Sequence, residues 1–242
     1  MLDAASRLPD GRPFAGSVLF DKDGVVVVNK PPGLPTAGRT LEDPDCLQWF
    51  AMQHYRRMVW CVHQLDADTS GALVLVRRKS LVPLWQARLQ APHANKTYLA
   101  WLQGEVADAC LEVRVPVGAL DSTGRQLGVT ATGKPAHTSI RRLAVSQGMT
   151  LCAVMLHTGR THQIRIHAQH VGHPLVGEEW YSNPPDHRHS RQALHAWRID
   201  VHAAPGQQFV APVPPDLQDF HRAAGFPDLG SILREIDDGQ LF

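Results

Sequence analysis

The sequence has no apolar run long enough to cross a membrane and no N-terminal apolar segment typical of a secretory signal. Its near-continuous apolar runs, Val25 to Val28 and Ala72 to Val76, are short, whereas a membrane-spanning helix needs about 20 apolar residues. We therefore expect a cytoplasmic protein with no membrane association.

Cysteine is also scarce. The chain has four cysteines in 242 residues, and they are isolated: Cys46, Cys61, Cys110 and Cys152. No CxxC pair suggests a zinc site, and no dense framework suggests disulfides. This pattern indicates ordinary thiols in a reducing compartment.

Net charge is small but unevenly distributed. The formal net charge is +1, yet residues 216–242 hold six acidic residues against two basic ones, which leaves 22 Lys and Arg against 17 Asp and Glu in residues 1–215. Affinity for nucleic acid rests largely on Lys and Arg that neutralise phosphates. Residues 1–215 are therefore moderately basic, although the acidic end of the chain brings the total charge close to zero.

Apolar patterning predicts more strands than helices. Helical spacing of apolar residues occurs at 47–55, 80–90 and 162–171, although a strand through Ile164 and Ile166 is an alternative to the last helix. Strand composition occurs near 17–20, 25–28, 72–76, 97–102, 111–115, 137–145, 150–156, 192–200 and 207–211. Because the strands do not alternate regularly with helices, we expect an α+β fold with a mixed, mostly antiparallel central sheet and flanking helices and loops.

The segment VHQLDADTSG, residues 62–71, places two acidic residues in a polar turn directly before an apolar strand. Asp66 and Asp68 could be turn residues whose carboxylates accept backbone N–H bonds. Alternatively, one of them could be a functional carboxylate held against a buried strand.

A second segment, ANKTYLAWL, has strand composition, with Lys96, Tyr98 and Ala100 on one face. Taken alone, it favours Tyr98 as a core residue. The alternative is a ring that stacks on a flat substrate such as a nucleic-acid base.

Residues 156–182 carry Arg165 and several histidines at helical spacing. Arg165 is either a solvated base or the partner of a buried carboxylate, which a guanidinium binds through its planar fork. A metal site is an alternative for the imidazoles of this stretch, but no carboxylate or cysteine stands at the spacing of a known zinc motif. The histidines concerned are His162, His167, His170 and His173.

Taken together and in this order, the segments resemble the RluA-type pseudouridine synthase family. VHQLDADTSG is similar to the family's HRLDxxTSG loop, KTYLA to its Lys-x-Tyr-x-Ala segment, and HTGRTHQIRIHAQHVGHPLVGEEWY to its GRTHQIR…GHP-LxGD…Y block. VVVVNKPPGLPT, RQALHAWRI and FVAPVPPDL also fit in order. The resemblance covers about residues 17–218 and implies the pseudouridine synthase fold.

The resemblance implies an enzyme that isomerises uridine in RNA to pseudouridine without a cofactor or a metal. It implies that Asp66 is the catalytic aspartate, that Tyr98 stacks on the target uracil, and that Arg165 pairs with the aspartate. Relatives modify ribosomal RNA, transfer RNA or both, so we expect one of these RNAs as partner. We expect a monomer without an obligatory protein partner.

The chain departs from the family pattern at Gln64, where the family has an arginine that enters the RNA and contacts its backbone. Gln64 can hydrogen-bond a base edge but lacks the charge of arginine. This substitution leaves open a noncatalytic RNA-binding or RNA-folding protein on the same scaffold. A metal-dependent hydrolase built on the histidines is a third hypothesis.

We expect three regions along the chain. Residues 1–16 form an N-terminal extension, 17–218 the catalytic domain, and 219–242 an acidic C-terminal tail. No S4-like RNA-binding module, which some relatives carry, is recognisable before the catalytic domain.

Overall fold

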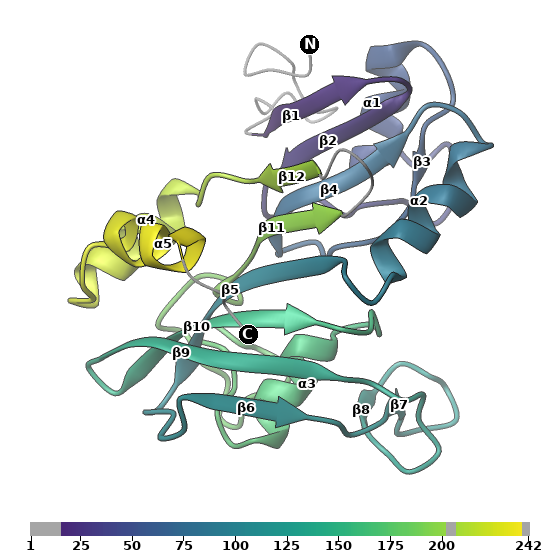
Figure 1. Ribbon diagram of the computed structural model, residues 1–242. Coiled ribbons are helices and arrows are strands. Elements are labelled where there is room, and N and C mark those ends of the chain that lie inside the picture. The colour runs from purple at the N-terminus through teal and green to yellow at the C-terminus, as the bar shows by residue number, and fades with distance from the viewer. Residues whose placement is uncertain (1–15, 202–206, 239–242) are drawn as a thin grey trace. The chain divides into compact units, whose positions relative to one another are not determined.

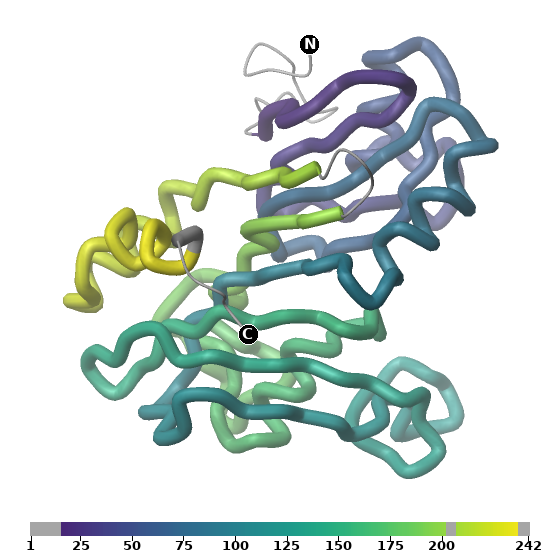
Figure 2. The backbone as a smooth tube through the Cα atoms, in the orientation of Figure 1, coloured from purple at the N-terminus to yellow at the C-terminus, as the bar shows by residue number. Residues whose placement is uncertain are grey.

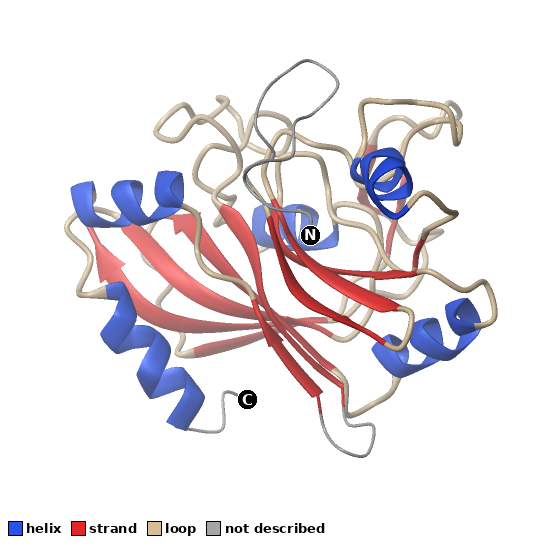
Figure 3. Ribbon diagram, turned by 90° about the horizontal axis from the view of Figure 1, so that it is seen from above, coloured by secondary structure: helices blue, strands red, loops and turns tan. Residues whose placement is uncertain are grey.

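The computed structural model describes residues 16–201 and 207–238, and within them it has five α-helices and twelve β-strands. Figure 3, coloured by secondary structure, shows that long strands rather than helices dominate the fold. Nearly all strand pairs are antiparallel, which confirms the expected α+β class. The chain divides into two compact units, unit 1 with Met1–Lys96 and His195–Val213, and unit 2 with Thr97–Leu194 and Pro214–Phe242.

Unit 1 is built on four neighbouring strands in the order β1-β2-β4-β11, with β3 beside β4 and β12 beside β11. Helices α1 and α2 belong to the same unit (Figure 1). The element bounds are β1 Ser17–Lys22, β2 Val25–Lys30, α1 Leu47–Tyr55, β3 Trp60–Cys61, β4 Ser70–Val76, α2 Leu81–Gln90, β11 Leu194–Val201 and β12 Gln207–Val210.

The local sequence explains these strands. Asp23 and Gly24 both have positive φ, which allows the two-residue turn that matches the twist of the β1–β2 hairpin. β2 and β4 are buried on both faces and read as continuous apolar runs. β11 runs parallel to β4, so two segments more than 100 residues apart in sequence lie side by side, as the chain trace shows (Figure 2).

Unit 2 has four antiparallel strands in the order β5-β10-β9-β6 and a small β7–β8 hairpin. Three helices complete it. The bounds are β5 Asn95–Gln103, β6 Cys110–Val113, β7 Val117–Ala119, β8 Leu127–Val129, β9 Thr138–Ser146, β10 Met149–Leu156, α3 Gln163–His170, α4 Pro215–Ala223 and α5 Leu229–Asp238.

The expected helices at 47–55, 80–90 and 162–171 are confirmed to within a residue or so, and the alternative of a strand through Ile164 and Ile166 is wrong. Two helices were not expected. α4 and α5 lie largely where composition suggested an acidic tail. The sequence pattern did not predict them because their buried apolar residues, Leu217, Ile232 and Ile236, are outnumbered by polar ones. The expected domain boundaries at 17 and 218 stay a prediction.

Two further observations concern whole segments. Within the described ranges, no helix has the length and apolar character needed to span a bilayer. Apart from Gly16, the expected N-terminal extension lies outside the described residues.

Candidate active site

Asp66 lies in the loop between β3 and β4, and its side chain is partly exposed. Its backbone carbonyl accepts a hydrogen bond from the N–H of Thr69 at 3.1 Å, which closes a turn immediately before β4. The two neighbours of Asp66 are tied to the end of β2 and to the loop that follows it. Position and exposure of Asp66 are therefore set by contacts on both sides of it.

On the C-terminal side, the fixing residue is Lys30, which is fully buried at the end of β2. Its Nζ donates to the carbonyl oxygens of Pro31 at 2.9 Å, Leu34 at 2.7 Å and Ala67 at 2.7 Å. An ammonium has three donors, and each of these carbonyls can take one. Lys30 thus joins the Pro-Pro-Gly loop to the residue after Asp66.

On the N-terminal side, the fixing residue is Thr36, whose side chain forms a reciprocal pair with the backbone of Leu65. Its hydroxyl donates to the carbonyl of Leu65 at 2.7 Å and accepts from the N–H of Leu65 at 3.0 Å. Thr36 and Leu65 are both buried. We call Lys30 and Thr36 the loop clamp, since together they fix the residues on either side of Asp66.

The base of β4 is held against β11 by two features. The hydroxyl of Ser70 lies 2.9 Å from His195 Nδ1, and His195 Nε2 lies 3.1 Å from the carbonyl oxygen of Ala211. Since that carbonyl can only accept, His195 carries its proton on Nε2 and accepts from Ser70. At Gly71 a Cβ would approach the Ala196 carbonyl oxygen to 2.2 Å, so glycine allows the two strands to meet.

His63 and Gln64 precede Asp66 and differ in environment. His63 Nε2 accepts the N–H of Val74 at 3.0 Å. Desolvation by burial, followed by the positive charge of Lys96, lowers the pKa of His63 to about 3. Gln64 is exposed, so a side chain at this position is available to a ligand.

Tyr98 lies on β5, opposite Val154 of β10, and is buried. Its burial fits the core interpretation that the segment alone favoured. Stacking of Tyr98 on a base stays a prediction.

Arg165 lies on α3, is buried, and pairs with a buried carboxylate, Glu178. Its Nε donates to Glu178 Oε2 at 2.9 Å and its Nη2 to Glu178 Oε1 at 2.6 Å. Of the two interpretations of Arg165, the one with a buried carboxylate partner therefore holds. The predicted pairing with Asp66 stays a prediction, since Asp66 belongs to the other unit.

The Arg165 guanidinium is also enclosed by two aromatic rings. Its Cζ lies 5.1 Å from the ring centroid of Trp180 and 5.0 Å from that of Tyr181. Glu178 Oε1 additionally accepts the N–H groups of Trp180 and Tyr181 at 3.0 and 3.3 Å. The segment after α3 therefore fixes the arginine on several sides.

Within the part of the chain that the structure describes, the donor atoms of the histidines around α3 do not gather as a set of metal ligands. Each of three has its own partner: His162 Nδ1 contacts the Tyr181 hydroxyl, His167 Nδ1 the Thr138 hydroxyl, and His173 Nδ1 the Gln103 carbonyl oxygen. The described residues whose donor atoms do gather are a different set, Glu112, His137 and His157. The hydrolase hypothesis built on the α3 histidines thus loses its structural basis.

The sequence interpretation missed three residues: Lys30 and Thr36, which fix the neighbours of Asp66, and Glu178, which pairs with Arg165. A signal for Lys30 was present, because it ends a strand that begins with four valines, and a lysine is rarely buried unless its charge is satisfied. A signal for Glu178 was present as well, because it stands at the acidic position that follows the glycine of the family's LxGD motif, but only the structure shows that it is buried whereas Glu179 is exposed.

Comparison with known proteins identifies the family. Residues 24–170 match the family model described as RNA pseudouridylate synthase. An uncharacterized RNA pseudouridine synthase of Chloroflexus aurantiacus is 39% identical over 161 residues, which cover 65% of this chain and 51% of the relative. Ribosomal large subunit pseudouridine synthase C of Yersinia pestis is 30% identical over 207 residues, which cover 84% of this chain and 64% of the relative.

The solved structure of human RNA pseudouridylate synthase domain containing 1 has the same fold, with a TM-score of 0.74 at 22% identity over 93% of this chain and 96% of that one. The chain spans between half and two thirds of the length of the two bacterial relatives. Because the family model covers more than half of the sequence, and includes the β3–β4 loop with Asp66, the chain belongs to the RNA pseudouridylate synthase family.

Proposed function

We propose that this chain isomerises specific uridines in structured RNA to pseudouridine, with Asp66 as the catalytic carboxylate. The observation that carries the proposal is the loop clamp, in which Lys30 and Thr36 fix the neighbours of Asp66 and leave its side chain partly exposed. An aspartate with only a structural role in a turn does not need a buried lysine that binds the carbonyl of the next residue, as Lys30 binds that of Ala67. A carboxylate that must meet one sugar carbon does need such fixed placement.

The reaction breaks the N1–C1′ glycosidic bond, rotates the uracil, and forms a bond from C5 to C1′. A carboxylate suits it because an anionic oxygen can stabilise or trap the electron-poor C1′ in the manner of a glycosidase nucleophile, and can then release the same carbon. The product is an isomer of the substrate, so no oxidant, reductant or cofactor is consumed.

The target uridine lies within folded RNA and has to be unstacked before the chemistry, at a cost of about a few kcal/mol. In our proposal Tyr98 stacks on the extruded uracil and offsets part of this cost. Arg165 favours the ionised form of the catalytic carboxylate, and its fork is oriented by Glu178. Gln64, exposed at the start of the same loop, contacts the RNA.

Ribosomal RNA is the first substrate to test, because the matched Yersinia pestis relative is named as a ribosomal large subunit enzyme. Transfer RNA is the second. The excess of basic residues before residue 216 provides the phosphate-neutralising charge that either RNA requires.

A second function, noncatalytic RNA binding or RNA folding, is favoured by one observation. Gln64 replaces the arginine that the family places beside its catalytic aspartate, and this position is exposed. A chain that had lost catalysis would keep its RNA surface and would not need Asp66.

The test is chemical mapping of pseudouridine across all stable RNA in wild-type cells, in a deletion strain, and in the deletion complemented with variants. We expect one or a few sites to vanish in the deletion and to return with the wild-type gene but not with Asp66→Asn. The matched control is Asp68→Asn, an exposed acid two residues along the same loop, which should restore the sites. Restoration by Asp66→Asn would overturn the proposed catalytic role, and an RNA phenotype without any lost pseudouridine would favour the noncatalytic function.

A further inference from the structure

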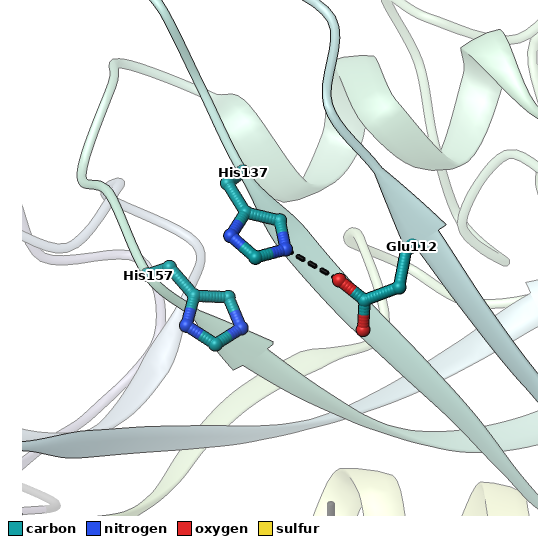
Figure 4. A group of neighbouring side chains, drawn as sticks. All are labelled: Glu112, His137 and His157. Atoms are coloured by element: carbon teal, nitrogen blue, oxygen red, sulfur yellow. Dashed lines mark hydrogen bonds and ion pairs between the residues drawn. The ribbon is translucent and has the colours of Figure 1, made fainter. Parts of the chain in front are cut away.

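Unit 2 gathers three side chains of the kinds that bind metal ions, none of them assigned a role in the proposed isomerisation: Glu112, His137 and His157 (Figure 4). One ligand atom of each lies within 4.8 Å of the others. His137 Nε2 donates a hydrogen bond to Glu112 Oε2, and the two imidazole rings stack with centroids 3.9 Å apart and 10° between their planes. We call these three residues the Glu-His-His cluster.

The sheet fixes the backbone at all three positions. Glu112 lies on β6 opposite Ser139, while His137 directly precedes β9 and His157 directly follows β10. The backbone N–H of His157 donates to the carbonyl of His137 at 3.2 Å, so the two histidines are hydrogen-bonded neighbours across the ladder. One residue of the cluster therefore lies on a strand and the other two lie directly at the ends of the adjacent strands.

Side-chain contacts add further order. The N–H of His137 donates to the Thr158 hydroxyl at 2.9 Å, and His157 Nε2 lies 2.8 Å from the Ser139 hydroxyl. Glu112 and His157 are exposed and His137 is partly buried. An ion can thus reach the cluster from solvent, and a position facing solvent remains open for water or another ligand.

We propose that the Glu-His-His cluster binds a divalent transition-metal ion of the zinc type, with two imidazoles and one carboxylate as ligands and one position left open. Imidazole nitrogen and carboxylate oxygen are a donor set that Zn²⁺ accepts in four-coordinate sites. Tetrahedral ligands about 2.0–2.1 Å from zinc lie roughly 3.4 Å from one another, a separation that the gathered donor atoms can reach by small side-chain rotations.

Binding exchanges one set of contacts for another. On binding, the proton of His137 Nε2 is transferred through water to His137 Nδ1, so that Nε2 and the Glu112 carboxylate each bond the ion instead. The stacked rings also have to tilt, because an ion lies in the plane of each imidazole that binds it. Rotation about the terminal side-chain bond of histidine meets only a broad, shallow preference, so the tilt costs little.

The ion would tie down the outermost strand of this part of the sheet. Among the strands that the structure describes, β6 pairs with β9 alone, and an ion held by Glu112 on one side and the two histidines on the other joins β6 to β9 and β10. The proposed role of the ion is therefore structural: it stabilises the edge strand β6 and takes no part in the isomerisation.

The experiment titrates Zn²⁺ into the full chain, first dialysed against chelator, by isothermal calorimetry. Wild type should bind one Zn²⁺ per chain, and Glu112→Gln, His137→Gln and His157→Gln should each weaken binding by about tenfold or more. His170→Gln and Cys110→Ser are the matched controls, because both residues are exposed metal-binding types outside the cluster. They should leave the affinity within about twofold.

A second measurement identifies the ligands. X-ray absorption at the zinc edge should show two imidazoles and oxygen donors at about 2.0–2.1 Å, with no sulfur at about 2.3 Å. The proposal is overturned if wild type does not bind Zn²⁺ at micromolar concentration, if the three cluster variants bind as wild type does, or if a control variant loses binding. Circular dichroism of each variant shows whether the sheet is intact, and three independent substitutions keep the test valid if one of them does not fold.

Discussion

Single residues in and around the β3–β4 loop hold their roles through burial and desolvation. Lys30 is a charged side chain with no exposed surface, and its ammonium is satisfied by three backbone carbonyls. His63, in the loop before Asp66, is partly buried, and desolvation together with the charge of Lys96 lowers its pKa. A buried charge or a desolvated imidazole is costly to disturb, so both residues give measurable predictions.

The first prediction concerns Lys30→Met, which keeps side-chain length but removes the ammonium. Three buried carbonyls lose their donor, so we expect the free energy of unfolding to fall by roughly 3 kcal/mol. Because the Ala67 contact adjoins Asp66, the single-turnover rate of pseudouridine formation should fall as well. Urea unfolding and a rate assay on the mapped RNA measure the two effects.

The control for Lys30→Met is Lys79→Met, since Lys79 is exposed and its substitution should change neither quantity. A Lys30→Met protein that is less stable but reacts at the wild-type rate would show that the loop clamp supports the fold without positioning Asp66.

The second prediction concerns pH. The pKa of His63 is about 3 in the folded chain and about 6.5 in an unfolded one, so protons bind preferentially to the unfolded state. The contribution of His63 to stability is complete above about pH 6.5 and is lost as the pH falls toward 3. Between pH 7 and pH 5 this loss amounts to about 2 kcal/mol.

His63→Gln should remove this part of the pH dependence, because Gln can accept the Val74 N–H without titrating. Urea unfolding at pH 7 and pH 5 measures it for wild type, His63→Gln and the exposed control His187→Gln. An unchanged pH dependence in His63→Gln, or the same flattening in His187→Gln, would contradict the prediction.

At the scale of elements, α3 is joined to the segment that follows it by a bidentate ion pair. Arg165 and Glu178 are both buried, and the pair is completed by backbone N–H groups on Glu178 and aromatic rings around Arg165. Burial of two charges is offset only while each has the other. The orientation of α3 relative to this segment therefore depends on the pair.

We expect Glu178→Ala to lower the free energy of unfolding by about 3–5 kcal/mol, because it leaves the Arg165 charge buried and unpaired. Glu179→Ala alters the adjacent, exposed glutamate and should change stability by less than about 0.5 kcal/mol. Chemical denaturation of both variants measures the two free energies of unfolding. If Glu178→Ala loses no more stability than Glu179→Ala, the ion pair contributes little.

At the scale of the whole molecule, charge is balanced locally at the acidic end of the chain. Asp216 of α4 accepts from Arg191 at 2.8 Å, Asp219 from Arg222 at 3.0 Å, and Asp228 from the Ser231 hydroxyl at 3.0 Å. Local partners thus reduce the field of these acids. Residues 1–215 carry 22 Lys and Arg against 17 Asp and Glu, so the excess of positive charge lies outside this end of the chain.

The fourth prediction follows from this charge balance. Gln64→Arg adds a cation at an exposed loop position, so RNA binding should tighten and its dependence on salt should steepen. One added phosphate contact changes the slope of log affinity against log salt by about 0.7–0.9. Filter binding at several salt concentrations measures the slope, and pseudouridine mapping follows site choice. If slope, affinity and site profile all stay unchanged, residue 64 does not contact the RNA.

Much of the fold was readable in the sequence because the signals are local. The apolar runs of β2 and β4 and the helical spacing of α1 and α2 lie within single segments, and the elements formed there. α4 and α5 were missed because their charge outweighed a narrow apolar stripe. Asp66, Tyr98 and Arg165 were selected through motifs, and their proposed roles await the mapping experiment.

By itself, then, the sequence determined the α+β class, the motifs of the family and the loop that carries Asp66. Only the tertiary structure decided that Lys30 reaches Ala67, that Arg165 takes Glu178 as partner, and that Glu112 meets two histidines. These contacts join positions 13 to 45 residues apart. The physical reason is that propensity and periodicity act over a few neighbouring residues, whereas side chains from separate segments meet only once strand register and packing are fixed.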